Sequence, residues 1–243
     1  AAIRHAQESR GLGDVYKRQD LKTPCILHIL TKKGKGMVST NANNDDYYLD
    51  AVKFHAVKPS NKANGKINKK TAPTIKTPVF QDVFGSLACE IARNRIDTVC
   101  ITAAMREGTG LVPYAKEFPS RYYDVGIAEG HGVTFAAGLA TQKVRPIVAI
   151  YSTFLQRAYD HIIHDAAIQH LPVVFCMDRA GIAGEDGPTH HGALDIAYLK
   201  CVQDLIVTAP KDGNELRHLL YTALDYSKGP FSIRYPKASS VNC

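Results

Sequence analysis

Apolar and polar residues come in alternating blocks along most of this chain, and the blocks predict alternating helices and strands. Short, nearly continuous apolar runs predict buried strands at 98–102, 122–125, 147–151, 172–178, 205–208 and 231–235. Longer amphipathic runs predict helices at about 78–94, 129–140, 153–170, 192–200 and 213–226. Continuous apolar strands are typical of parallel sheets. The pattern therefore predicts an α/β fold, a parallel sheet flanked by helices on both faces.

The first 77 residues have a different pattern, which predicts separate segments. Residues 1–19 contain Gly-Leu-Gly-Asp-Val-Tyr-Lys-Arg-Gln, a run typical of translated adapter sequence, so we expect a non-native tail or a disordered native terminus. An apolar run followed by a basic glycine turn predicts that residues 20–57 are the end of a preceding domain. Residues 58–77 hold six lysines and no acidic residue, which is typical of a solvated linker. The main domain is then 78–237, and 238–243 would begin a further segment.

Charge and composition exclude several classes of protein. The net charge is +7, but much of the excess lies in the lysine-rich linker, which lacks the interleaved aromatic residues that stack on bases. No apolar run reaches the roughly 18 residues that a membrane span needs. The six cysteines form no CxxC pair and most have apolar neighbours, which favours reduced core thiols over disulfides or a metal site. We therefore expect a soluble protein without a nucleic-acid or membrane partner and without a metal site of its own.

Residues with chemical potential cluster where the predicted strands end. Glu129 opens an apolar helix after the strand at 122–125, and Tyr151 ends the third strand. Phe154 and Arg157 follow directly, and Arg179 follows the fourth strand. Carboxyl ends of parallel strands meet at one edge, where ligands bind in α/β sheets. A carboxylate beside an aromatic ring and arginines suggests a cofactor that needs a proton and a stacking partner, although Glu129 alone could simply complement a helix dipole.

Several motifs together resemble the 1-deoxy-D-xylulose-5-phosphate synthase family, a branch of the transketolase-like thiamin diphosphate enzymes. They are 103–110 (Ala-Ala-Met-Arg-Glu-Gly-Thr-Gly), 124–131 (Asp-Val-Gly-Ile-Ala-Glu-Gly-His), 151–160, 178–181 (Asp-Arg-Ala-Gly), 184–192 and 234–236 (Arg-Tyr-Pro). The resemblance covers about residues 20–237. It implies a pyrimidine-binding domain preceded by the end of a diphosphate-binding domain.

The resemblance also implies how the cofactor is held and activated. Glu129 matches the glutamate that bonds N1′ of the cofactor's aminopyrimidine, and a carboxyl group there favours the imino form of the 4′-amino group, which takes the C2 proton. Phe154 matches the aromatic residue that stacks on the pyrimidine, and Tyr151 matches a position at the edge of the active site. Met37 stands where the family commonly has a tyrosine near the cofactor, and a thioether packs but donates no hydrogen bond.

Further matches imply the substrates. Arg157, Arg179 and Arg234 match arginines near the substrate phosphate, and guanidinium groups suit glyceraldehyde 3-phosphate because they bind phosphate in a bidentate way. His190 matches a substrate-facing histidine with catalytic function, Asp186 its acidic neighbour, and His55 a second histidine at the active-site edge. The implied reaction joins pyruvate, with loss of CO₂, to glyceraldehyde 3-phosphate in isoprenoid precursor synthesis, in a homodimer of the bacterial cytoplasm or plastid stroma.

The departures from the family pattern leave alternatives open. The Gly-Asp-Gly motif and the later asparagine that hold Mg²⁺ and the diphosphate are missing, and so is the third domain. We therefore expect a fragment that is inactive alone. Another family member, a transketolase or a 2-oxo acid dehydrogenase β subunit, is a second interpretation. A non-catalytic dimerisation module on the same fold is a third.

Overall fold

The structure is a computed structural model of the 243-residue chain, and it describes residues 23–24 and 77–240. Residues 77–240 contain a sheet of six strands, all parallel, in the order β2-β1-β3-β4-β6-β5. The strands are β1 (Thr98–Thr102), β2 (Tyr122–Asp124), β3 (Arg145–Tyr151), β4 (Val174–Asp178), β5 (Ile206–Thr208) and β6 (Phe231–Arg234). The predicted fold class is confirmed, and the predicted strands agree with the observed ones to within two residues.

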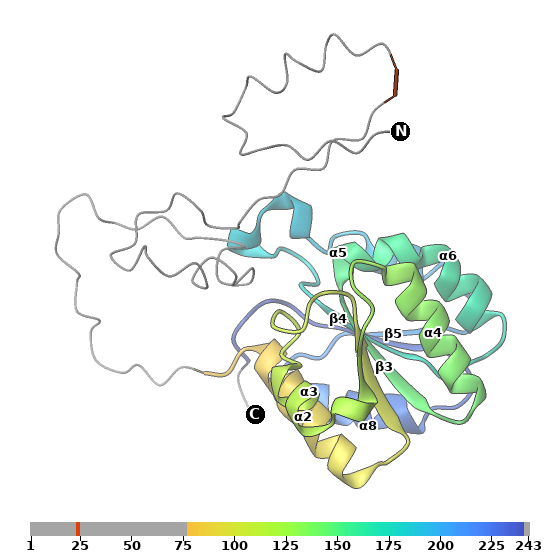
Figure 1. Ribbon diagram of the computed structural model, residues 1–243. Coiled ribbons are helices and arrows are strands. Elements are labelled where there is room, and N and C mark those ends of the chain that lie inside the picture. Colours follow the sequence, from red (N-terminus) through yellow and green to blue (C-terminus); the bar gives the residue numbers. More distant parts are fainter. Residues whose placement is uncertain (1–22, 25–76, 241–243) are drawn as a thin grey trace, which may run out of the picture. The chain divides into compact units, whose positions relative to one another are not determined.

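Helices cover both faces of the sheet and form a three-layer domain (Figure 1). One layer holds α2 (Phe80–Asn94), α3 (Val112–Glu117) and α8 (Gly213–Asp225). The other holds α4 (Glu129–Thr141), α5 (Ser152–Leu155), α6 (Tyr159–His161) and α7 (Asp195–Leu199). The short helix α3 was absent from the prediction, because six residues are too few to show a helical period.

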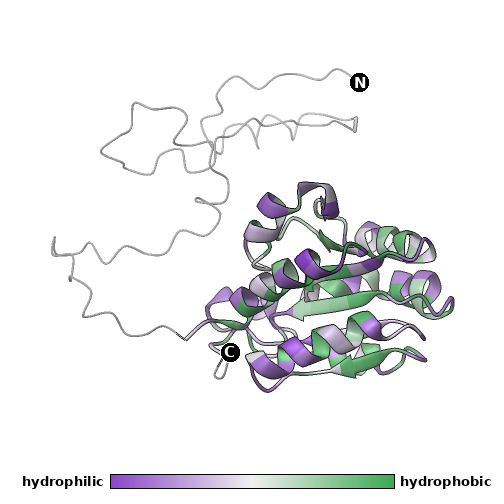
Figure 2. Cartoon of the chain, turned by 90° about the horizontal axis from the view of Figure 1, so that it is seen from below, coloured by the Kyte–Doolittle hydropathy of each residue, from purple (hydrophilic) through white to green (hydrophobic). Residues whose placement is uncertain are grey.

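The two faces of the sheet bury two separate hydrophobic clusters. Along β3, Ile147 and Ala149 belong to the cluster beneath α2 and α8, while Val148 and Ile150 belong to the cluster beneath α4. Successive side chains of a strand point to opposite faces, so a strand covered on both sides must be apolar throughout. Figure 2 shows hydrophobic residues concentrated in the sheet and hydrophilic ones on the outer helix surfaces. This burial explains the continuous apolar runs of the sequence.

The segment predicted as one helix at 153–170 is interrupted. After α5 come a 3₁₀ turn at Gln156–Ala158, the short α6, and a π-helical turn at Ile162–Ala167. The prediction of a single regular helix was therefore wrong. A change in residues per turn alters the direction in which successive side chains leave the helix, and π turns are frequent at functional sites. We call residues 152–167 the interrupted helix.

The connection from β2 to β3 positions the functional edge. β2 pairs with β1 on one side and β3 pairs with β1 on the other, so the chain crosses over β1 through α4. Such a reversal of strand order opens a crevice at the carboxyl ends of the strands, where ligands bind in α/β proteins. The first residue of α4 and the last residue of β3 lie at this edge. None of the helices in residues 77–240 has the length and hydropathy that a membrane crossing requires.

Candidate active site

Glu129 is a buried carboxylate at the start of α4. Its side chain is 5% exposed, and no side chain caps the helix. The unpaired N–H groups and the dipole of the first turn favour a negative charge at this end of a helix. Oε1 of Glu129 accepts a hydrogen bond of 3.1 Å from Nη1 of Arg157, whose side chain is 60% exposed. The structure therefore brings these two predicted site residues together.

Aromatic rings from two segments gather beside this pair. The rings of Tyr151 and Phe154 are stacked, with centroids 5.4 Å apart and planes 14° apart. The His190 ring meets both edge-on, at 6.3 Å from Tyr151 and 5.3 Å from Phe154. The Arg157 guanidinium carbon lies 5.3 Å from the Phe154 centroid. Arg157 thus contacts both the carboxylate of Glu129 and the ring of Phe154, while His190 is held at the same edge.

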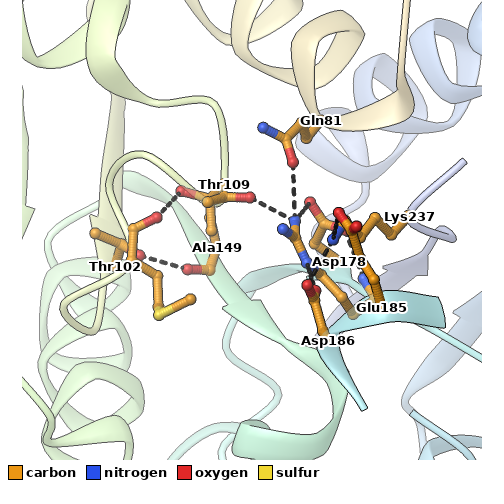
Figure 3. A network of polar contacts seen from close by, with 11 residues as sticks. Gln81, Thr102, Thr109, Ala149, Asp178, Glu185, Asp186 and Lys237 are labelled. Atoms are coloured by element: carbon orange, nitrogen blue, oxygen red, sulfur yellow. Dashed lines mark hydrogen bonds and ion pairs between the residues drawn. The ribbon is translucent and has the colours of Figure 1, made fainter. Parts of the chain in front are cut away.

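Arg179 lies at the centre of a second, enclosed polar network. Its Nη1 donates to the Gln81 side chain at 2.9 Å, to the Gly108 carbonyl at 2.7 Å and to Asp178 Oδ2 at 3.0 Å. Its Nε donates to Asp186 Oδ2 at 3.3 Å. Figure 3 shows the labelled members Gln81, Asp178 and Asp186 converging from different segments of the fold. The Arg179 side chain is only 8% exposed, so this guanidinium is fixed in one orientation.

Asp178 holds both the backbone and the side chain of Arg179. Its Oδ1 accepts from the Arg179 backbone N–H at 2.5 Å while Oδ2 takes the guanidinium. Arg179 has a φ of 58°, a left-handed conformation that non-glycine residues adopt only where neighbours enforce it. Burial of Asp178 raises the pKa of its carboxyl group to about 6, although the Arg179 charge and hydrogen bonds oppose the shift. The carboxylate thus fixes the direction in which Arg179 leaves β4.

A glycine-rich loop supplies the outer part of this network. Gly181 and Gly192 exchange two backbone hydrogen bonds, of 2.9 and 2.8 Å, which close the loop that carries Asp186 and His190. Asp186 Oδ1 accepts from Lys237 Nζ at 2.5 Å. Burial acts to raise the pKa of Asp186, but Lys237 and Arg179 outweigh it and hold that pKa below its usual range.

Gly192 fixes the base of the loop because it allows no side chain. A Cβ at this position would lie 2.3 Å from Ser152 Oγ and 2.5 Å from the Arg179 carbonyl oxygen. The loop therefore rests on the start of the interrupted helix and on the backbone of Arg179. Arg179 also contacts the aromatic rings of the site, because its Cζ lies 4.1 Å from the Tyr151 ring centroid.

Arg234, the third predicted arginine, lies at the end of β6 in different surroundings. Its Nε and Nη2 donate to the two carboxylate oxygens of Asp195, at 2.8 and 3.3 Å, and Asp195 is 1% exposed. Arg234 lines a groove of about 520 Å³ together with Lys200 and Thr208. Its guanidinium is therefore already engaged by a buried carboxylate that, among the described residues, takes no part in the Arg179 network.

Some residues that contact the predicted arginines were not predicted from the sequence, and two predicted site residues lie outside the described part of the chain. Gln81, Lys237 and Asp195 were not predicted, although Lys237 follows directly on the recognised Arg-Tyr-Pro motif and could have been found there. Met37 and His55 lie outside the described residues. Within residues 23–24 and 77–240, no group of three or more His, Cys, Asp or Glu residues is placed to hold a metal ion.

Comparisons with known proteins show which family the chain resembles. Residues 76–241 match the family model described as transketolase, pyrimidine binding domain. The chain is 52% identical over 222 residues to 1-deoxy-D-xylulose-5-phosphate synthase of Aquifex aeolicus (strain VF5), covering 91% of this chain and 33% of the relative. The corresponding synthase of Klebsiella pneumoniae is 50% identical over 223 residues, covering 92% of the chain and 34% of the relative. The chain thus spans about a third of the length of these relatives.

Solved structures show the same fold. Transketolase from Campylobacter jejuni superposes with a TM-score of 0.62 at 20% identity, over 74% of this chain and 29% of that one. A split-gene transketolase, described as an inactive β4 tetramer, superposes with a TM-score of 0.59 at 25% identity. That match covers 69% of this chain and 54% of the other. The parallel sheet with its two helix layers is therefore shared with transketolases.

Proposed function

The chain belongs to the family of transketolase pyrimidine-binding domains, and from this premise we propose that its carboxyl edge holds the aminopyrimidine of thiamin diphosphate in a 1-deoxy-D-xylulose-5-phosphate synthase. The observation that carries the proposal is the Glu129 carboxylate, buried at the helix N-terminus beside the ring of Phe154. Two curated synthases at about 50% identity support the choice of this activity over that of other family members.

The residues present suit the cofactor's pyrimidine ring. A ring nitrogen that shares a proton needs a carboxyl group, and a flat heterocycle needs an aromatic face. Glu129 supplies the first, and Phe154, half-buried and braced by Tyr151, supplies the second. In this proposal Glu129 holds a proton at N1′ while Phe154 orients the ring. Bound thiamin diphosphate supplies a nucleophilic C2 carbon for attack on a 2-oxo acid such as pyruvate.

The cationic side chains around this point suit a phosphorylated acceptor. We propose that Arg157 binds the phosphate of glyceraldehyde 3-phosphate, while the enclosed Arg179 and Lys237, three residues after β6, add positive charge beside it. Arg157 is exposed and has one ion-pair partner, so its guanidinium retains donors for a ligand. His190 and Asp186 would contact the substrate from the glycine-rich loop. Arg234 is also engaged already, because Asp195 takes two of its donors.

The remaining parts of the proposal concern the whole protein. Mg²⁺ and the cofactor's diphosphate would be held by a diphosphate-binding domain, with His55 and Met37 near the cofactor, and the assembled enzyme would be a homodimer in the bacterial cytoplasm. The curated relatives, about three times as long as the matched segment, support a requirement for further domains. We expect the 243-residue chain alone to show no turnover.

The test is a chimera in which this chain replaces the matching segment of the Klebsiella pneumoniae synthase. We expect it to form 1-deoxy-D-xylulose 5-phosphate from pyruvate and glyceraldehyde 3-phosphate.

In the chimera, Glu129→Gln should slow exchange of the cofactor's C2 proton by about a hundredfold or more, the scale of a lost acid–base group. Glu107→Gln, at an exposed carboxylate in the loop after β1, is the matched control and should leave exchange unchanged. Wild-type exchange in the Glu129 variant would refute the assignment. Activity with transketolase substrates instead would support the second interpretation.

A further inference from the structure

A histidine in the interrupted helix occupies the space next to Glu129. The second residue of α4 is Gly130, and a Cβ at this position would lie 2.7 Å from His161 Cε1, 3.0 Å from Nε2 and 3.1 Å from Nδ1. The first distance is shorter than real Cβ contacts, and the other two are tighter than most of them. The imidazole therefore lies against the Gly130 backbone and fills the place of a side chain. Only glycine fits there while His161 keeps its position.

Hydrogen bonding does not account for the position of this histidine. His161 makes no hydrogen bond to the described residues, and its Nδ1 is buried without a partner. An unpaired buried nitrogen costs free energy, so a purely apolar side chain would stabilise this contact better. The ring is therefore held by van der Waals packing between α4 and the interrupted helix.

The contact belongs to a regular row between α4 and the interrupted helix. Arg157, His161 and Asp165 are spaced four residues apart, and each touches the first part of α4. Arg157 bonds Glu129 at 3.1 Å, His161 covers Gly130, and Asp165 Oδ2 accepts from Thr134 Oγ1 at 2.5 Å. The middle contact lies where the first turn of α4 comes against the interrupted helix. The polar contacts on either side of it depend on the separation of the two helices.

We infer that His161 is a positioning residue that acts through Gly130. It sets the first turn of α4 against the interrupted helix, and thereby the place where the Glu129 carboxylate meets Arg157. The value of this position for catalysis rests on the proposed function. The geometric claim itself does not, because it concerns contacts within this chain and is measurable without cofactor.

The test uses the full 243-residue chain and a cycle of variants. Gly130→Ala should force the ring aside and reduce the nuclear Overhauser contacts between the Arg157 and Glu129 side chains at least threefold, measured well below the melting temperature. His161→Ala should weaken the same contacts by removing the spacer. The double variant should recover part of the wild-type signal, because the new methyl group occupies the vacated space. His161→Phe, which keeps a flat ring, should preserve the contacts.

Gly138→Ala is the matched control. It lies on the same helix with no atom within 4 Å of its Cβ position, so the Arg157–Glu129 contacts should be unchanged and the melting temperature unchanged or higher. Unchanged contacts in Gly130→Ala would overturn the inference, and so would a double variant as perturbed as the two single changes combined. If the contacts respond as expected but Glu129→Gln leaves C2 exchange in the chimera intact, the proposed function fails and the positioning role of His161 stands.

Discussion

Two arginines at the same edge of the sheet are held in opposite ways. Arg157 has a side chain 60% exposed, one hydrogen bond to Glu129, and a position over one aromatic ring. Arg179 has a side chain 8% exposed and donates to four groups from separate segments. An enclosed cation with many acceptors keeps one geometry, whereas an exposed cation with one acceptor can exchange it for a ligand. We therefore expect Arg179 to organise the edge and Arg157 to respond to what binds there.

Removing the enclosed arginine should have the largest effect on stability. Arg179→Met leaves the buried Asp178 carboxylate without its counter-ion, and we expect a loss of about 3–5 kcal/mol in the free energy of unfolding. Urea unfolding of the full chain at pH 7 measures this. A loss below about 1 kcal/mol would show that the two arginines do not differ as described.

The difference in the pH dependence of stability between the wild type and Asp178→Asn should report the raised pKa of Asp178. Its pKa is raised in the folded state, to about 6, so between pH 4 and 6 the folded protein holds a proton that the unfolded chain has released. This group therefore lowers the stability as the pH rises through that window, by an amount on the order of 2–3 kcal/mol. In Asp178→Asn that decline should be absent. Parallel pH profiles for the two proteins would contradict the raised pKa.

A substitution at Gly192, the base of the glycine-rich loop, should have a smaller effect on stability. Gly192→Ala places a methyl group against Ser152 and the Arg179 carbonyl, and we expect a loss of about 1–3 kcal/mol from overpacking. Gly138→Ala is the control, since Gly138, like Gly192, has no left-handed backbone and has no atom within 4 Å of a Cβ. Thermal melting compares the two. An equal loss in both would show that crowding at Gly192 adds nothing.

The smallest effect on stability should come from the exposed arginine. Arg157→Met should cost about 1 kcal/mol or less, because the Arg157 side chain is exposed and the helix N-terminus still stabilises the buried Glu129. In the chimera the same variant should raise KM for glyceraldehyde 3-phosphate about tenfold or more, the scale of a lost charged hydrogen bond. A variant with normal KM would remove Arg157 from the phosphate site.

Much of the fold could be predicted from the sequence because the strands are buried on both faces. Burial makes most residues of β1, β3 and β4 apolar, and this signal is local and strong. The interrupted helix could not be predicted in the same way. Its changes of pitch leave no periodic signal in the sequence, and it packs on α4 through contacts such as Asp165 with Thr134 that are remote in sequence.

The candidate site likewise has a part that could be predicted from the sequence and a part that could not. The sequence was enough to show which residues follow the ends of the strands. Because parallel strands finish at one edge of the sheet, Glu129, Tyr151, Phe154 and Arg157 could be placed together there. The sequence could not show that Arg179 is enclosed, that Arg234 is paired with Asp195, or that His161 lies on Gly130. Those facts depend on side-chain directions and on distances between segments that only the packed structure decides, since a hydrogen bond or a void is set within a fraction of an ångström.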